Sequence, residues 1–174
     1  MEYLYDGWFK VGSRTYNGRV FEYVVDKDAS GAIVEDADGK LLLVRQFRPA
    51  LLRESLEIPA GCLDKPGLGF KEVMVEELAE EAHLDVKAED LKFLVKFNPV
   101  VGMSDSRYFL YYYKYPHVGI DSLNDEDVDV TEILWVSREE FYEKILSGEI
   151  SDLKSQMAFF YLEYLKNNDF LEEK

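Results

Sequence analysis

The sequence has few of the residues that would place it outside the cell or in a membrane. It has one cysteine, Cys62, which cannot form an internal disulfide. Its first ten residues lack the basic start and apolar run of a signal peptide. No apolar run approaches the roughly 20 residues that span a bilayer. We therefore expect a soluble protein of a reducing compartment, the cytoplasm, with no membrane partner.

Basic residues are also scarce. The 174 residues include 20 Lys and Arg against 35 Asp and Glu, a net charge of −15. Because this charge repels phosphate, it excludes nucleic acid and an anionic membrane surface as the main partner. A small ligand bound through divalent cations is compatible with it. The length and the 47% hydrophobic content suit one domain with a sizeable core.

Strand patterns precede helix patterns along the chain. Residues 19–26 and 31–47 read as extended, with a turn at Asp38-Gly39, and a Pro- and Gly-rich passage follows from residue 57 to 69. From Phe70 to Ala82 apolar residues recur at helical intervals. Residues 91–97 and 106–115 return to strand character, and the acidic residues 121–130 read as a loop.

Two further helices are predicted near the C-terminus. Ser137 and Glu140 have the spacing of a capping box, which starts a helix leading to Gly148. Ser151 or Asp152 caps the last helix, which ends near residue 167. The chain therefore predicts a mixed sheet with helices on its faces, in the α/β or α+β class.

The predicted helix at 70–82 concentrates carboxylates. On a helical wheel at about 100° per residue, Glu77 and Glu81 fall on the apolar side, whereas Glu72 and Glu76 turn to solvent. A solvated acidic face explains the outer pair but not the inner one, because two partly buried carboxylates one turn apart repel each other and resist desolvation. A divalent cation would compensate. Mg²⁺ prefers oxygen ligands and is often shared with substrate phosphates, and Glu80 adds a third carboxylate.

This helix and the preceding segment "LEIPAGCLDKPG" resemble the Nudix box, the loop-helix signature of hydrolases that act on nucleoside diphosphates linked to another group. The residues that match the box are Gly61, Glu77, Leu78, Glu80, Glu81 and Leu84. Glu76 replaces the family's arginine, His83 replaces the closing glycine, and the early glutamate position falls on residue 67 or 68. The spacing from Gly61 to the helical acids is one residue longer than usual.

These departures affect the loop and the helix end. In the family, the arginine and the early glutamate form an ion pair that braces the loop. Replacing both residues therefore leaves neither charge without its partner. His83 stands where a helix end needs a positive φ, a conformation that histidine tolerates. Glu76 adds negative charge beside the expected metal, which motivates an alternative function, a nucleotide-sugar sensor that binds ligand with weakened catalysis.

The resemblance extends over roughly residues 20 to 165. Residues 41–64, "LLLVRQFRPALLRESLEIPAGCLD", and residues 147–162 are similar to ADP-ribose and nucleotide-sugar pyrophosphatases, and the longer loop is similar to the UDP-sugar branch. The resemblance implies an α/β/α sandwich over residues 29–174. It also implies an N-terminal antiparallel strand extension, residues 1–28, that commonly exchanges with a partner to form a homodimer.

The resemblance implies roles for several residues around this box. Glu77, Glu80, Glu81 and the backbone carbonyl of Ala60 would bind Mg²⁺, with Mn²⁺ as an alternative ion. Glu57 would help to bind metal or substrate, the alternative being a simple loop ion pair.

Arginines would bind the substrate and a loop acid would activate water. Arg45 and Arg48 would clamp diphosphate or sugar oxygens with paired hydrogen bonds, and Arg107 would contact the sugar phosphate. Ordinary surface roles are the alternatives. Glu126 is the first candidate for the general base, followed by Asp127 or Asp129, against a solvated acidic loop. The implied reaction is Mg²⁺-dependent hydrolysis of a nucleoside diphosphate sugar, ADP-ribose first and UDP-glucose second.

Overall fold

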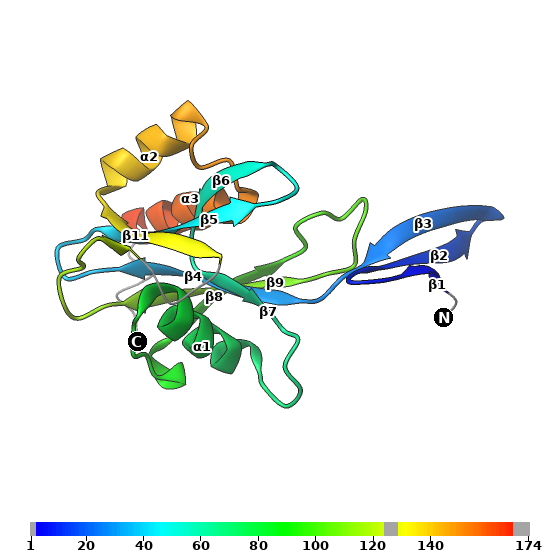
Figure 1. Cartoon of the computed structure of the whole chain (residues 1–174), viewed down its shortest axis with the longest axis horizontal. Coiled ribbons are helices and arrows are strands. Elements are labelled where there is room, and N and C mark those ends of the chain that lie inside the picture. Colours follow the sequence, from blue (N-terminus) through cyan, green and yellow to red (C-terminus); the bar gives the residue numbers. More distant parts are fainter. Residues whose placement is uncertain (1–2, 124–128, 169–174) are drawn as a thin grey trace.

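The computed structural model describes residues 3–123 and 129–168 and contains two sheets. The N-terminal sheet is antiparallel and projects from the rest of the molecule (Figure 1). Its hairpin turn uses Asn17 and Gly18, both with positive φ, as such two-residue turns require. Its strands are β1 (Tyr3–Asp6), β2 (Lys10–Tyr16) and β3 (Arg19–Val25).

The large sheet has the strand order β10-β11-β5-β4-β9-β8, with β6 paired to β5 and β7 paired to β4. It is mixed, because β4 and β9 are parallel and the other pairs are antiparallel. Its strands are β4 (Ala29–Glu35), β5 (Leu41–Arg48), β6 (Arg53–Glu57), β7 (Ala60–Cys62), β8 (Lys92–Phe97), β9 (Tyr108–Lys114), β10 (Ser122–Leu123) and β11 (Val130–Val136).

Helices cover both faces of this sheet, α1 on one and α2 and α3 on the other (Figure 1). Residues of β5 alternate between the faces, so Leu42 packs with Met74 and Leu78 of α1, whereas Leu41 packs with Phe141 of α2. The predicted α/β/α sandwich is therefore confirmed. The helices are α1 (Phe70–Ala82), the short 3-10 helix η1 (Ala88–Asp90), α2 (Arg138–Ser147) and α3 (Leu153–Asn167).

The predicted helix ends are confirmed in detail. Ser137 and Glu140 form both halves of a capping box at the start of α2. Asp152 caps α3 by accepting a hydrogen bond from the backbone N–H of Ser155 at 2.9 Å. His83 ends α1 in the left-handed conformation, with φ 56° and ψ 32°, which explains how a non-glycine residue serves there.

The acidic segment at 121–130 differs in part from the predicted loop. Ser122 and Leu123 pair with β11 as the short strand β10, and Val130 already belongs to β11. This pairing covers the outer edge of β11, which would otherwise expose unpaired backbone groups. Residues 124–128 lie outside the described residues.

The sheet divides between β4 and β5, and this division positions the site. The two strands pair only at Glu35 and Leu41, next to their turn, and then separate. Beyond that point β6 pairs with β5, and β7 pairs with β4. The segment joining β6 to β7 therefore crosses the division, and the N–H of Ala32 donates to the carbonyl of Pro59 at 3.1 Å. Helix α1 packs against β4 and β7. Within the described residues, no helix has the length and apolarity needed to cross a membrane.

Candidate active site

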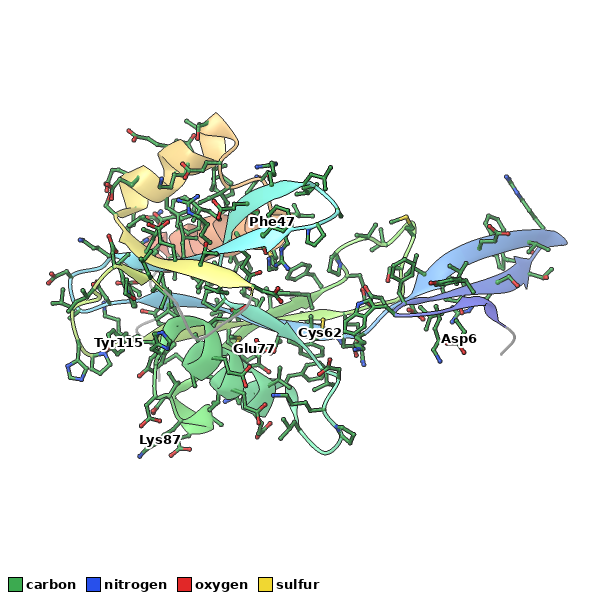
Figure 2. The ribbon with its side chains drawn as sticks, viewed as in Figure 1. Asp6, Phe47, Cys62, Glu77, Lys87 and Tyr115 are labelled. Atoms are coloured by element: carbon green, nitrogen blue, oxygen red, sulfur yellow. The ribbon has the colours of Figure 1, made fainter. Side chains whose placement is uncertain are left out.

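The carboxylate of Glu77 lies directly over the backbone of Gly61. A Cβ placed on Gly61 would overlap the side chain of Glu77, so a larger residue here would displace that carboxylate from its position. Figure 2 labels Glu77 where α1 meets the central sheet. The first glycine of the motif thus acts by leaving room for the carboxylate.

Glu81 is the buried partner of Glu77, one helical turn further along. Its side chain accepts a hydrogen bond from the backbone N–H of Ala60 at 3.0 Å and another from the side-chain amide of Gln46. Burial, and secondly the charge of Glu77, raise the pKa of Glu81 to about 8. At neutral pH this carboxyl group therefore holds a proton unless a cation stabilises its charge.

This carboxylate pair suits a divalent ion that is shared with a substrate. Among residues 3–123 and 129–168, no three His, Cys, Asp or Glu side chains converge as a complete metal cage does. Mg²⁺ is often held by one or two carboxylates, with water and substrate phosphates completing its shell. Glu77 and Glu81 fit that pattern, whereas Glu80 is exposed and lies 3.6 Å from Lys65. A metal role for Glu80 stays a prediction.

Glu57 forms a second charged group beside this pair. It is buried, and it accepts hydrogen bonds from Arg48 Nε at 2.7 Å, from Arg48 Nη2 at 2.5 Å and from Lys154 Nζ. Burial acts to raise the pKa of Glu57, but the hydrogen bonds and charges of the two cations outweigh it and lower the pKa to about 2. These three side chains line a surface pocket of about 320 Å³ together with Ser55 and Asp152.

The two charged groups form one site. Gln46 and Arg48 lie two residues apart on β5 and therefore point to the same face; Gln46 binds Glu81 and Arg48 binds Glu57. The pKa of Arg48 is raised first by its hydrogen bond to Glu57 and further by the charges of Glu57 and Glu81. A phosphate ligand bound where β4 and β5 separate would therefore lie near the carboxylates of Glu57 and Glu81 and near the guanidinium of Arg48.

Two predicted substrate residues are paired elsewhere. Arg45 donates to Glu132 at 2.6 Å and lies 3.7 Å from Glu149. The guanidinium and backbone N–H of Arg107 both bind Asp28. Substrate contacts by these two arginines stay predictions, and each would require its ion pair to open.

The predicted general bases belong to the segment before β11. Glu126 and Asp127 lie outside the described residues. Asp129 is exposed, and its carbonyl accepts a hydrogen bond from the N–H of Phe47 at 3.4 Å. Its backbone is therefore next to the end of β5 that carries Arg48; Figure 2 labels Phe47 on that strand. The choice of base stays a prediction.

The structure shows what balances Glu76, which the sequence left unexplained. Lys65, in the longer loop before α1, forms an ion pair with Glu76 and also lies near Glu80. The sequence predicts that the loop loses the family's ion pair, because both residues that form it are replaced. Instead a cation from the loop meets an anion on the helix, so a brace is present with its charges exchanged.

Sequence reasoning missed Gln46, Lys154 and Ser155. Gln46 stands between the two arginines that were considered, and its amide binds Glu81. Lys154 and Ser155 are separated from their partners Glu57 and Ile58 by 97 residues each. Only the similarity at 147–162 marked that region.

The family model described as "NUDIX domain" matches residues 26–156 of this chain. The chain belongs to the Nudix family of hydrolases. The box departs from the family pattern at Glu76 and His83, yet the helix, its left-handed end and the inward pair Glu77 and Glu81 are all present in this Nudix domain.

Named relatives cover most of the chain. ADP-ribose pyrophosphatase of Bacillus subtilis (strain 168) is 28% identical over 142 residues, 82% of this chain and 75% of the relative. Methanol dehydrogenase activator of Bacillus methanolicus is 30% identical over 147 residues, with the same coverage of both chains. Uridine diphosphate glucose pyrophosphatase NUDT14 of Bos taurus is 32% identical over 82 residues, 42% of this chain and 37% of the relative.

A solved structure supports the Nudix fold. The crystal structure of an ADP compounds hydrolase superposes with a TM-score of 0.73 at 20% identity, covering 96% of this chain and 92% of that one. The match includes almost the whole chain.

Proposed function

We propose that this Nudix hydrolase cleaves the diphosphate bond of a nucleoside diphosphate sugar, giving a nucleoside monophosphate and a sugar phosphate. ADP-ribose is the first substrate and UDP-glucose the second, in keeping with what two relatives are named for. The observation that carries this proposal is the buried Glu81 beside Glu77, adjoining a pocket lined by Arg48.

The side chains of this site would hold the ion and orient the diphosphate. Mg²⁺, or Mn²⁺ in its place, supplies charge neutralisation of the diphosphate and activation of water when bound. Glu77 and Glu81 would hold the ion, with Glu80 and the Ala60 carbonyl as further ligands. The Ala60 N–H and the Gln46 amide fix the orientation of the Glu81 carboxylate.

The arginines and the acidic loop complete the proposed site. Arg48 would direct two N–H groups of its guanidinium at phosphate oxygens, a geometry that suits Arg better than Lys. Glu57 would hold Arg48 in place before substrate arrives. Arg45 and Arg107 are secondary substrate contacts, and Glu126 would accept the proton of the attacking water.

The test is to incubate the protein with ADP-ribose, UDP-glucose or GDP-mannose, with Mg²⁺ or with EDTA, and to measure the nucleoside monophosphate that is released. We expect metal-dependent release of nucleoside monophosphate by the wild type and none by the Glu77→Gln/Glu81→Gln variant. Glu72→Gln is the matched control, because this acid is exposed on the same helix. Binding of a nucleotide sugar without any turnover would instead support the sensor.

We also propose that residues 1–28 form a homodimer with a second copy, while residues 29–174 act as the hydrolase domain in the cytoplasm. The support is that the projecting sheet exposes apolar side chains: Trp8 is 80% exposed, Tyr16 70% and Val20 63%. Light scattering on the purified chain should give twice the chain mass. A Trp8→Ser/Val20→Ser variant that stays folded should give the monomer mass, and a monomeric wild type would contradict this part.

A further inference from the structure

Glu57 has two cationic partners that are held very differently. Lys154 is 14% exposed and contacts two carboxylates, Glu57 and Asp152, the latter at 2.9 Å. Arg48 is 42% exposed. Within residues 3–123 and 129–168, Glu57 is the only ion-pair partner of Arg48.

The position of Lys154 is fixed by the first turn of α3. Asp152 accepts hydrogen bonds from the N–H of Ser155 at 2.9 Å and from its hydroxyl at 2.6 Å. The same buried hydroxyl accepts a hydrogen bond from the N–H of Ile58 at 2.9 Å. Since Ile58 directly follows Glu57, the helix end that holds Lys154 is tied to the strand end that holds its partner.

The backbone of Arg48 pairs with Arg53 and accepts a hydrogen bond from the N–H of Leu51 at 2.9 Å, but its side chain is much less enclosed than that of Lys154. Arg48 is the last residue of β5, and the turn that follows contains Leu52 in the left-handed conformation, with φ 53°. Its side chain lines the open pocket of about 320 Å³. Rotation of this side chain toward a ligand in the pocket therefore breaks its ion pair with Glu57 and, among residues 3–123 and 129–168, no other ion pair of Arg48.

The free-energy cost of that movement depends on the charge that remains beside Glu57. Glu57 is 5% exposed, and a buried carboxylate left without a cation is destabilised by several kcal/mol. With Arg48 as the sole partner, each binding event would carry this penalty. With Lys154 in place, Glu57 keeps one cation after Arg48 leaves.

We propose that Lys154 is the resident counter-ion of Glu57, and that it thereby frees Arg48 to bind the diphosphate oxygens of the substrate. This inference rests on the proposed function for the identity of the ligand. Lys154 is a positioning residue, because it acts through Glu57 and Arg48 and does not itself contact the substrate.

The test measures binding of inorganic pyrophosphate and of ADP-ribose by calorimetry, with Mg²⁺ and with EDTA. The variants are Lys154→Met, Lys154→Arg, Glu57→Gln and Glu57→Gln/Lys154→Met, with thermal unfolding as the check on folding. Lys154→Met should weaken binding by about 30-fold or more, the low end of what breaking a buried, hydrogen-bonded charge pair costs. Lys154→Arg keeps the charge and should restore most of the affinity.

The double variant separates this proposal from simpler roles. Once Glu57→Gln has removed the carboxylate charge, no counter-ion is needed, so adding Lys154→Met should change the dissociation constant by no more than about twofold. If Lys154→Met weakens binding equally in both backgrounds, Lys154 contacts the ligand directly and the proposal is overturned. If the wild type binds pyrophosphate neither with Mg²⁺ nor with EDTA, the proposal is also overturned.

The hydrolysis measurements decide the proposed function separately. Turnover of a nucleotide sugar with no effect of Lys154→Met on binding would sustain the proposed function and reject the counter-ion role. If the variants show the predicted binding pattern but no nucleotide sugar is turned over, the counter-ion role is sustained and the proposed function is rejected. For a substrate that is turned over, Lys154→Met should raise KM more than it lowers kcat.

Discussion

Replacing Glu81 by glutamine removes the carboxyl group with the most unusual environment in the site. Its side chain is 5% exposed, and burial together with Glu77 raises its pKa from 4.5 to about 8. Glutamine keeps an oxygen that can accept from the N–H of Ala60, while it cannot ionise. The Gln46 amide, which donates to the other oxygen of Glu81, would have to turn its own oxygen toward the new NH2 group, so the effect of the charge is read from the pH dependence of stability and not from its absolute value.

The magnitude follows from the difference between the two pKa values. At 1.36 kcal/mol for each pKa unit, a change from 4.5 to about 8 corresponds to about 5 kcal/mol. Because the pKa of Glu81 is higher in the folded state, its contribution to the free energy of unfolding is fully present below about pH 4.5. This contribution falls as pH rises and is lost above about pH 8. The metal-free wild type should lose up to this amount of unfolding free energy across that range.

Urea unfolding followed by tryptophan fluorescence, from pH 5 to pH 9 in EDTA, measures this loss. The difference between wild type and Glu81→Gln cancels the titrating groups that do not interact with Glu81, so it should change steadily with pH. Mg²⁺ should restore the stability of the wild type at pH 9 and leave Glu81→Gln unchanged, since an ion that binds only the folded state stabilises it. Glu72→Gln should follow the wild type. Parallel pH curves for wild type and Glu81→Gln would refute this account of the buried pair.

Three further substitutions test neighbouring parts of the site. Gly61→Ala places a Cβ where the Glu77 carboxylate lies and should displace that flexible side chain, with loss of turnover in a hydrolysis assay and little loss of stability; unchanged turnover would contradict the close approach. Lys65→Glu should lower turnover several-fold, and the exchanged pair Lys65→Glu/Glu76→Arg should restore it. Ser155→Ala leaves a buried backbone N–H without its acceptor and should cost about 1–3 kcal/mol in urea unfolding, whereas Ser155→Thr should cost less.

Local signals account for what the sequence predicted well. The bounds of α1 follow from apolar spacing, which places Met74 and Leu78 in the core and Glu81 beside them. The left-handed end at His83 follows from its position in the motif. The capping box at Ser137 needs only two residues three apart. Each signal lies within about one helical turn, where sequence spacing determines distance.

Long-range contacts account for what the sequence did not predict. Lys154 meets Glu57, and Ser155 meets Ile58, only because α3 packs on the same face as Leu56 and Ile58. The strand at Ser122 forms because β11 presents an open edge. In both cases the deciding partner is distant in sequence, and no local pattern contains it.

The exchanged brace shows why the substituted box positions still fit together. An ion pair needs opposite charges, and either side can carry the cation. The family places the cation on the helix, whereas this chain places Lys65 in the loop and Glu76 on α1. Glu76 alone would be a repulsive neighbour of Glu77 and Glu80; its ion pair with Lys65 joins the loop to the middle of α1 and offsets that repulsion.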